Sequence, residues 1–428
     1  HQISVTQRGE VLLVGGRGGG ELGLSRWNGR FWKNYASPQD TGFFYRYFSY
    51  AVTEDSRGGI WVGSFMGGIA WFKGDTTLFF NHFPATGSRL IGYGTSSPEI
   101  DFVLTPALAS DPDGNIWILN RGAADGRVLV CVPSDFLDNP SPDREWYYFH
   151  RTAFGNYPHF DVLSVDGLGR KWIASTDPTA IAGRGVYVLD DRRTPEDPSD
   201  DRIWGPIGGL GSPQIFDLTY DPAGYMWAGS IDGAYYALAS GSDLTNVTFS
   251  SIYPLRNISV NAIAVDPAGN KWFGTEFGIL VLGPDLFTVV QTIGADPDGP
   301  LPHPKVNTIG IEPLTGRVWV GTEEGTVVMR TPYREFGPRI ASLTLEPNPF
   351  NPLRSSLRFT GSSLAGGGEA LILTLGGDVV RRLTHYEAAW GWDGKDSRGG
   401  WVADGIYLVV VYNPQGEVAR AKVAVVKK

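Results

Sequence analysis

The side chains that most often carry catalysis or hold metal ions are sparse in this chain of 428 residues. No two of its histidines stand at H-x-H or i, i+4 spacing, which is the pattern expected of a zinc site. The single cysteine, Cys131, excludes an intrachain disulfide framework and a CxxC metal motif. We therefore predict no metal site and no cofactor. The six histidines are His1, His82, His150, His159, His303 and His385.

Two other segments carry residue types that bind ions. The stretch Asp190–Asp201 holds six carboxylates, and Ca²⁺ prefers oxygen ligands of this kind. Because Arg192 and Arg193 lie among these acids, we interpret the stretch as a solvated insertion between a third and a fourth strand. The glycine run Gly15–Gly20 is similar to a phosphate-binding loop, but neither a Lys-Ser/Thr pair nor a helix follows it. We interpret it as a loop between strands.

Arginines and tyrosines in predicted loops form the remaining candidate site. The arginines lie in long loops between the second and third strands of the repeat described below, and the tyrosines lie in loops that join one repeat to the next. Aromatic rings stack on sugars, and guanidinium groups bind carboxylate or phosphate. We predict that these residues meet at one mouth of the fold and bind a ligand; alternatively, the rings cover sheet edges and the arginines are solvated. The candidate residues are Arg17, Arg121, Arg184, Tyr45, Tyr47 and Tyr157.

Composition and charge exclude several classes of protein. With 36 basic and 45 acidic residues the net charge is −9, whereas a nucleic-acid-binding domain is expected to be strongly basic. The longest apolar run near the C-terminus, Ile406–Tyr412, has the length of a strand and is far too short to span a membrane. Glycine and proline number 57 and 29, which is turn-rich but below the fraction typical of disordered chains. The length predicts two or three domains.

One sequence pattern occurs six times: an apolar strand, an acidic residue, a glycine turn and a second strand that carries tryptophan. A seventh copy near the N-terminus has Leu13 at the tryptophan position. Successive copies are 45 to 56 residues apart, and each interval offers four short strands and no long amphipathic helix. Seven copies at this spacing, with four strands in each interval, predict an all-β fold with a seven-bladed β-propeller over residues 1–335. The repeated tryptophans are Trp61, Trp117, Trp172, Trp227, Trp272 and Trp319.

Each residue of the pattern has a structural explanation. The acidic residue and the glycine form a tight turn, because the carboxylate accepts backbone hydrogen bonds and glycine adopts positive φ. Tryptophan fills the wedge between neighbouring sheets and buries ~150–250 Å². The small Gly-Ser or Gly-Thr pair that follows permits close approach of the next blade. We therefore assign the motif to folding and not to catalysis.

The repeat D-x-x-G-x-x-W-x-G-T resembles the two-component-regulator propeller repeat of bacterial sensor ectodomains and secreted proteins. It differs from the sialidase Asp-box, S-x-D-x-G-x-T-W, in which the tryptophan stands on the other side of the turn. The resemblance covers about 330 residues and implies the fold.

The seventh blade is predicted to be incomplete. Three strands are expected, at Val306–Ile311, Arg317–Gly321 and Thr326–Arg330, before the chain leaves the repeat. An open outer strand invites pairing with another strand. The missing strand is expected from residues upstream of His1, which would imply a longer precursor that has lost its N-terminal part. The alternatives are Tyr333–Phe336 and a strand from another molecule.

Residues 340–428 follow a different pattern. Alternating apolar runs with turn signals at short intervals predict about seven strands in an Ig-like β-sandwich. The hexad Pro347–Pro352 favours extended backbone, because each proline restricts itself and the residue before it.

This segment resembles the C-terminal sorting domain of type IX secretion substrates and the related Ig-like domain of flagellar hook-capping proteins. Asp404 departs from the small residue that the family usually has before Gly-x-Tyr. The resemblance implies export through the outer membrane to the cell surface or beyond; a structural module with no sorting role is the alternative. The matching residues are Pro347, Asn348, Pro349, Phe350, Asn351, Pro352, Trp392, Asp393, Gly394, Lys395, Asp396, Gly399, Gly405, Ile406, Tyr407, Val425, Val426, Lys427 and Lys428.

The pattern assigns nine of the fourteen tryptophans to architecture, six in the repeat and three in the C-terminal segment. The high tryptophan content therefore indicates a fold more strongly than it indicates a carbohydrate ligand. The five left for other roles are Trp27, Trp32, Trp71, Trp146 and Trp204.

Together these features predict a secreted or cell-surface propeller protein that is not an enzyme and that acts in binding or surface assembly. The expected partners are the type IX secretion machinery and a surface glycan or another protein subunit, with no nucleic acid and no membrane span. One alternative is a glycan hydrolase or lyase with its site at the propeller mouth. The other is a structural subunit that polymerises when its open seventh blade receives a partner's strand.

Overall fold

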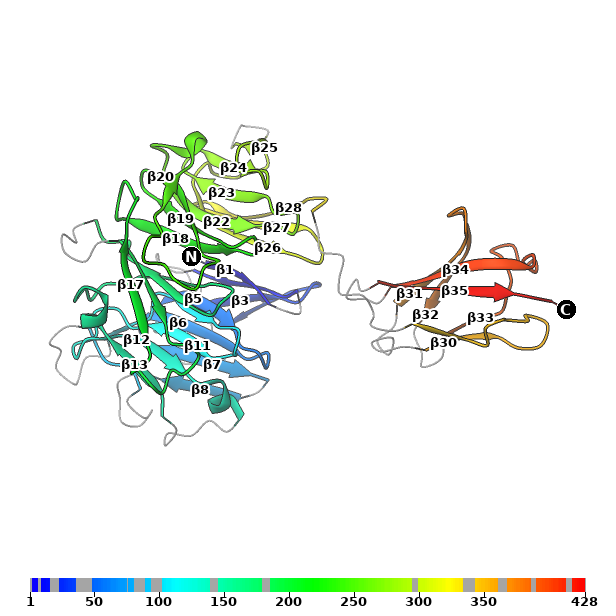
Figure 1. Cartoon of the computed structure of the whole chain (residues 1–428), viewed down its shortest axis with the longest axis horizontal. Coiled ribbons are helices and arrows are strands. Elements are labelled where there is room, and N and C mark those ends of the chain that lie inside the picture. Colours follow the sequence, from blue (N-terminus) through cyan, green and yellow to red (C-terminus); the bar gives the residue numbers. More distant parts are fainter. Residues whose placement is uncertain are drawn as a thin grey trace. The chain divides into compact units, whose positions relative to one another are not determined.

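A computed structural model describes most of the chain as two compact units, His1–Tyr333 and Arg334–Lys428 (Figure 1). The described residues are 2–6, 9–15, 23–35, 48–74, 76–80, 89–93, 102–138, 145–178, 185–294, 299–333, 343–360, 368–385, 390–412 and 418–427.

The described residues of the first unit form seven antiparallel sheets, which we number as blades one to seven. Blade one contains β1 (Gln2–Val5), β2 (Val11–Val14), β3 (Leu24–Trp27) and β4 (Trp32–Tyr35). Blade two contains β5 (Phe48–Glu54), β6 (Ile60–Met66), β7 (Ile69–Lys73) and β8 (Thr76–Phe80), with β9 (Val103–Leu104) beside β6. Blade three contains β10 (Leu108–Ser110), β11 (Ile116–Leu119), β12 (Arg127–Val132) and β13 (Tyr147–His150).

The remaining four sheets have the same strand order. Blade four contains β14 (Val162–Val165), β15 (Lys171–Ala174), β16 (Val186–Asp190) and β17 (Arg202–Ile207), and blade five contains β18 (Ile215–Asp221), β19 (Tyr225–Ser230), β20 (Gly233–Leu238) and β21 (Ser250–Ser251). Blade six contains β22 (Val260–Val265), β23 (Lys271–Thr275), β24 (Gly278–Leu282) and β25 (Val289–Ile293). Blade seven contains β26 (Val306–Glu312), β27 (Arg317–Thr322) and β28 (Gly325–Arg330).

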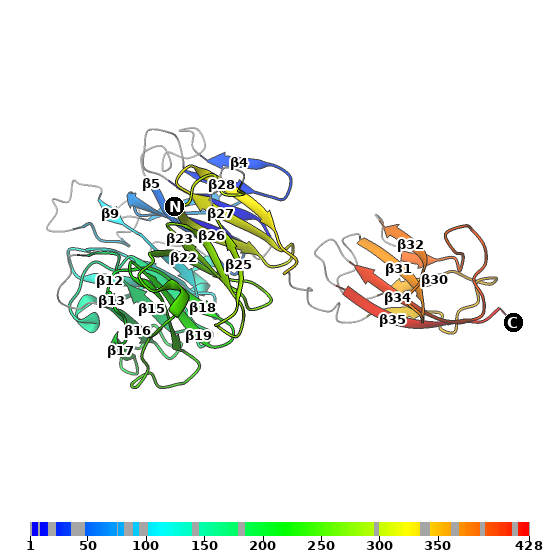
Figure 2. The ribbon, with the colours of Figure 1, turned by 90° about the horizontal axis from the view of Figure 1, so that it is seen from above.

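The first strands of the sheets form a closed ring, because each contacts the first strand of the next sheet and β26 contacts β1 (Figure 2). At the closure, the backbone N–H of Ile3 donates to Thr308 Oγ1 at 3.1 Å. Gly310 faces the Ile3 side chain so closely that a Cβ there would lie 2.4 Å from Ile3 Cγ2. This unit is a β-propeller, as the repeat predicts.

The acidic residue of the repeat has two roles. In blade two, Asp55 Oδ1 accepts the backbone N–H groups of Arg57 and Gly59 and so forms the predicted turn. Its other oxygen accepts the Trp61 indole N–H at 3.0 Å, a bond that the sequence analysis missed. The same bond joins Trp117 to Asp111, Trp172 to Asp166, Trp272 to Asp266 and Trp319 to Glu312. The turn therefore fixes the tryptophan that fills the core.

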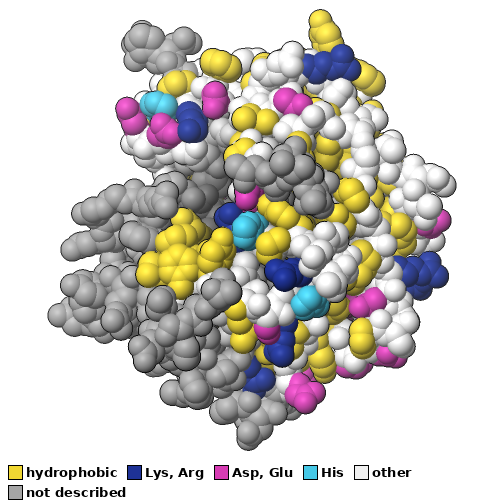
Figure 3. Space-filling model, turned by 90° about the vertical axis from the view of Figure 1, so that its left-hand side faces the viewer, with side chains coloured by type: hydrophobic (Ala, Val, Ile, Leu, Met, Phe, Trp, Pro, Cys, Tyr) yellow, Lys and Arg dark blue, Asp and Glu magenta, His cyan; other side chains and the backbone are white. Residues whose placement is uncertain are grey.

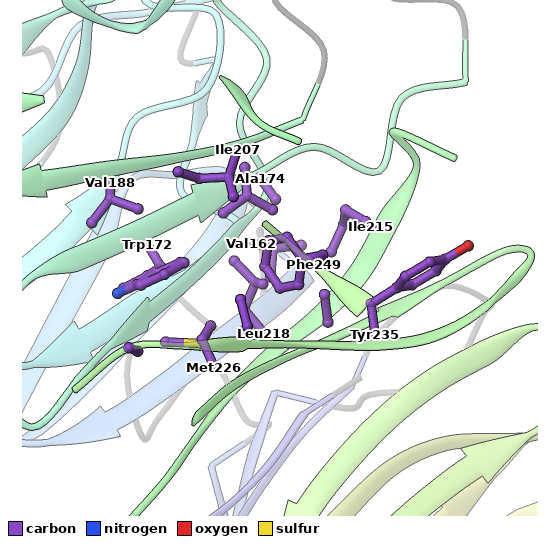
Figure 4. Packing of buried hydrophobic residues seen from close by; sticks show 14 of the residues in the cluster. Val162, Trp172, Ala174, Val188, Ile207, Ile215, Leu218, Met226, Tyr235 and Phe249 are labelled. Atoms are coloured by element: carbon purple, nitrogen blue, oxygen red, sulfur yellow. The ribbon is translucent and has the colours of Figure 1, made fainter. Parts of the chain in front are cut away.

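Tight packing between blades explains the glycine that stands two positions after the tryptophan in four of the six repeats. A Cβ on Gly274 would lie 2.5 Å from Val306 Cγ1 of blade seven, and one on Gly229 would lie 2.7 Å from the Val260 carbonyl of blade six. Figure 4 shows the resulting core between blades four and five, where Trp172 packs with residues that include Met226 and Phe249.

The five tryptophans that the sequence analysis left for other roles also contribute to packing, which corrects that interpretation. Trp27 and Trp32 pack against each other and against Trp319 of blade seven, at ring-centroid distances of 5.5 to 6.4 Å. Trp71 donates its indole N–H to Asp55 at 2.8 Å, and Trp204 donates to Asp243 at 3.3 Å. Trp146 packs 5.0 Å from Phe80.

Blade seven has three strands among the described residues, and none of the described strands pairs with the outer edge of β28. Of the segment Tyr333–Phe336, only Tyr333 lies within the described residues, where it is not part of a strand. Which strand completes this blade stays a prediction.

The second unit has seven strands among its described residues, in two sheets that enclose one hydrophobic core. Phe350 and Trp392 are fully buried in this core. The strands are β29 (Thr344–Glu346), β30 (Leu357–Thr360) and β33 (Trp390–Trp392) in one sheet, and β32 (Val379–His385), β31 (Gly368–Thr374), β34 (Gly405–Tyr412) and β35 (Val418–Val425) in the other.

The residues that resemble a sorting motif hold this second unit together. Asn348, between Pro347 and Pro349, donates its side-chain amide to the Lys422 carbonyl at 2.9 Å and accepts the Ala424 N–H at 3.1 Å. The motif therefore runs beside β35, with Phe350 N–H donating to the Ala424 carbonyl at 2.7 Å.

The tryptophan and tyrosine of the motif also have structural partners. Trp392 donates to the Lys395 carbonyl at 2.9 Å, and Tyr407 donates to the Ala403 carbonyl at 3.0 Å. Asp393 pairs with Arg381 at 3.2 Å, and Gly394 is at φ 78°, where a Cβ would collide with Pro352.

At the start of β34, Asp404 lies just before Gly405 and pairs with Lys427 Nζ at 3.8 Å. Asp404, which differs from the small residue usual in the sorting family, thus forms an ion pair with a lysine near the end of the chain. Lys428 lies outside the described residues.

Candidate ligand-binding site

A polar cavity of about 430 Å³ lies where the first strands of the blades meet. Every blade contributes to it, and most of its polar side chains stand near the start of a first strand. Side-chain amides and carboxylates dominate this polar lining, so the cavity can both donate and accept hydrogen bonds. The polar residues that line it are Gln2, Tyr50, Asp161, Asp217, Thr219, Asn261, Asn307 and Thr308.

Asp217 is a carboxylate held inside this cavity. Its Oδ2 accepts the backbone N–H of Ile263 in blade six at 2.6 Å, so it also links two blades. Burial raises the pKa of Asp217 from 3.8 to about 7, although hydrogen bonds from Ile263, Leu218 and Thr219 act in the opposite direction. Near neutral pH the side chain is therefore present in both the acid and the carboxylate form.

Asp161, just before β14, is the centre of a second polar network. Its Oδ1 accepts from Arg121 Nη1 at 2.6 Å. Its Oδ2 accepts the Thr176 backbone N–H at 3.1 Å, the Thr176 hydroxyl at 3.0 Å and the Ser175 hydroxyl at 3.4 Å. Burial raises the pKa of Asp161, and Arg121 and Thr176 partly offset that effect. Both oxygens of this carboxylate are thus occupied by donors from blades three and four.

Tyr157 and His159 extend the network outward. Tyr157 Oη lies 3.1 Å from Ser175 Oγ, which also accepts the Asp177 N–H. His159 Nδ1 lies 3.5 Å from Asp177 Oδ2, and its Nε2 lies 3.2 Å from Tyr93 Oη. The Tyr93 and His159 rings stack at 5.6 Å. Figure 3 shows a face of the molecule on which histidine, basic and acidic side chains lie close to hydrophobic ones.

Two of the six predicted ligand-binding residues, Arg121 and Tyr157, are brought into this one network, in which Arg121 contacts Asp161 directly and Tyr157 is linked to it through Ser175. The other four lie outside the described residues: Arg17, Arg184, Tyr45 and Tyr47.

Sequence reasoning missed Asp161 and Asp217, although one signal was available for Asp161. In several repeats a polar residue stands five positions before the acidic residue of the turn. Asp161 precedes Asp166 in this way, as Asn261 precedes Asp266. These positions open onto the axis of the ring, where a polar residue costs little because it faces the cavity.

In the described part of the chain, no group of three or more His, Cys, Asp or Glu side chains is arranged to hold a metal ion. The helices described are short 3-10 turns, and none is long and apolar enough to cross a membrane. The side chains around Asp217 and Asp161 can contact a ligand through hydrogen bonds and through charge.

Comparison with known proteins identifies the fold. No protein-family model and no curated protein sequence matches the chain. Among solved structures, it is similar to PorZ, a surface component of the type IX secretion system of Porphyromonas gingivalis, with a TM-score of 0.62, 19% identity, and coverage of 99% of this chain and 59% of PorZ.

The extracellular domains of two putative hybrid two-component systems of B. thetaiotaomicron are also similar. For BT4673 the TM-score is 0.56 at 12% identity, covering 99% of this chain and 56% of that one. For BT3049 the TM-score is 0.52 at 15% identity, and the match covers 99% of this chain and 55% of that one. The chain thus spans less than two thirds of each of these proteins, and the likeness establishes the β-propeller fold.

Proposed function

We propose that this chain is a secreted or cell-surface β-propeller that binds a polyhydroxylated ligand, of the saccharide class, at the axis of its ring. The observation that carries the proposal is the polar cavity, where Asp161 and Asp217 face side-chain amides from other blades. Carboxylates accept hydrogen bonds from sugar hydroxyls, and side-chain amides both donate hydrogen bonds to them and accept hydrogen bonds from them. The similarity to a bacterial surface component and to extracellular domains supports the location.

A binding role is favoured over catalysis by the state of the two carboxylates. A glycosidase uses one carboxyl group as acid and another as base or nucleophile. Asp161 is a poor base or nucleophile, because Arg121 and Thr176 occupy both of its oxygens. The raised pKa of Asp217 does suit a general acid, so we keep a glycan hydrolase or lyase as the second candidate. Release of reducing ends by the purified protein, lost in Asp217→Asn, would establish it.

The experiment for binding uses a glycan array, followed by calorimetric titration of the saccharide that binds best. Asp161→Asn and Asp217→Asn are expected to weaken binding at least tenfold. Asp243→Asn is the matched control, because that carboxylate is exposed and lies outside the cavity. Binding that persists unchanged in both cavity variants, or an array with no signal, would overturn the proposal.

We further propose that residues 340–428 direct export by a type IX-like route. The support is the resemblance of the Pro347–Pro352, Trp392–Asp396 and Gly405–Tyr407 segments to the sorting family. Deletion of residues 340–428 is expected to leave the propeller in the periplasm of a host with that secretion system. Normal surface display of the truncated protein would contradict the sorting role.

A further inference from the structure

A second cavity, of about 530 Å³, lies beside β13, the outer strand of blade three. Among the described residues, it shares no lining residue with the axial cavity. Its volume falls within the range of about 300–1,000 Å³ that is typical of ligand pockets. We call it the β13 groove and define it by six of its lining residues: Arg89, Arg127, Glu145, Tyr147, Tyr148 and Glu196.

One side of the β13 groove is basic and rigid. The Arg89 guanidinium lies 5.7 Å from the centroid of the Trp146 ring, and Arg127 lies 4.7 Å from that of Tyr148. Arg89 is only 8% exposed and also hydrogen-bonds to Tyr148. Cation–π stacking of this kind holds a planar guanidinium in one orientation. Both cations are therefore held against the same tyrosine, and Arg127 is held further by its ion pair with Asp125, in which Nε lies 2.8 Å from Oδ2.

The support beneath these cations is part of the protein core. Trp146 is 3% exposed and packs 5.7 Å from Phe136. Because the ring cannot move without disturbing this core, the guanidinium stacked on it is held firmly as well. Such rigidity lowers the entropic cost of binding an anionic group.

The other side of the groove is acidic. Glu145 and Glu196 line it together with Tyr147. Burial is the largest cause that raises the pKa of Tyr147, and the charges of Glu196 and Glu145 add to it. Both carboxylates line the same groove as the two guanidinium groups, and they supply hydrogen-bond acceptors there.

We infer that the β13 groove binds a saccharide that carries a carboxylate, namely a uronic acid residue. The two arginines bind the carboxylate by charge-assisted hydrogen bonds. Glu145 and Glu196 accept hydrogen bonds from the hydroxyl groups of the same ring. A simple oxyanion such as sulfate satisfies the arginines but offers no donors to the glutamates, and a neutral sugar does the reverse. A uronic acid satisfies both sides at once.

The experiment is a calorimetric titration of the full chain with trigalacturonate, with its methyl-esterified form and with inorganic sulfate. Trigalacturonate is expected to bind at least tenfold more tightly than either of the others. Arg127→Gln is expected to weaken trigalacturonate binding at least tenfold, and Glu196→Gln at least threefold. Arg193→Gln is the matched control, since that arginine lies in the same insertion as Glu196 but does not line the groove, and it should bind normally.

Asp161→Asn separates this inference from the axial site, because it should leave trigalacturonate binding in the β13 groove unchanged. Three results would each overturn the inference. The first is that the methyl ester or sulfate binds as well as trigalacturonate. The second is that Arg127→Gln, shown to be folded by circular dichroism, binds like the unaltered protein. The third is the absence of any heat of binding at millimolar trigalacturonate.

Discussion

Where the second strand ends, blades five and six follow the repeat closely, whereas blades three and four depart from it. In blade five, the Ser230 hydroxyl donates to the Gly233 carbonyl at 3.0 Å. In blade six, the Thr275 hydroxyl donates to the Gly278 carbonyl at 2.8 Å. In each case the hydroxyl after the glycine closes its own short hairpin.

In blades three and four the same position has different partners. Asn120 replaces the hydroxyl residue in blade three, and its buried amide has no hydrogen-bond partner among the described residues. The next residue, Arg121, reaches Asp161 of blade four. Ser175 of blade four keeps the hydroxyl but directs it to Tyr157 and Asp161. Ser175, which does not close a hairpin of its own, thus becomes part of the candidate site, next to Arg121.

The largest effect is expected where a regular blade loses its core. Trp272→Ala removes a buried ring and its bond to Asp266, and should lower the free energy of unfolding of the propeller by about 3–5 kcal/mol. Denaturant unfolding measures this. Phe277→Ala is the control in the same blade, since that ring is 72% exposed and its loss should matter little. Equal effects for the two variants would show that the repeat tryptophan is not a structural anchor.

A pH effect is expected from Asp217. Its pKa rises from 3.8 to about 7 on folding, so between these values the folded protein holds a proton that the unfolded chain has released. The free energy of unfolding should therefore fall as pH rises from 4 to 7, by up to about 4 kcal/mol. Asp217→Asn should remove this slope. Identical pH profiles for the two proteins would contradict the raised pKa.

A smaller effect tests how closely the regular blades approach each other. Gly274→Ala places a Cβ 2.5 Å from Val306 Cγ1, and should cost about 1–3 kcal/mol of stability. Gly208→Ala is the control, because a Cβ there has no described residue within 4 Å. Should both variants unfold at the same denaturant concentration, the small residue is not needed for packing between blades.

The smallest effects contrast two hydroxyl groups directly. Thr275→Val should lower the free energy of unfolding by about 1 kcal/mol, the usual value of one hydrogen bond, and leave saccharide affinity unchanged. Ser175→Ala should instead weaken saccharide binding severalfold, because it disconnects Tyr157 from Asp161. Thermal unfolding and calorimetry on both variants measure the two quantities. If Thr275→Val instead weakened saccharide binding and Ser175→Ala lowered only the stability, the proposed difference between the two pairs of blades would be wrong.

The fold was predictable because the repeat occupies the same positions in each blade. The glycine, the acidic residue and the tryptophan each satisfy a local requirement that recurs at Trp61, Trp172 and Trp272. The candidate site was only partly predictable. Arg121 and Tyr157 were proposed from their residue types, but Asp161 stands just before an apolar strand and Asp217 within one, where only the ring reveals that they face a cavity. The β13 groove was also missed, because it joins residues as distant in sequence as Arg89 and Glu196.

Hydrogen–deuterium exchange with and without the best-binding saccharide of the array tests the central claim most directly, since it observes all blades in one experiment. The account predicts that the saccharide slows exchange in residues 120–126, 157–163 and 175–178 of blades three and four. It predicts no change in the hairpins at 230–233 and 275–278 of blades five and six. Protection of those two regular hairpins, with none around Arg121 and Asp161, would contradict it.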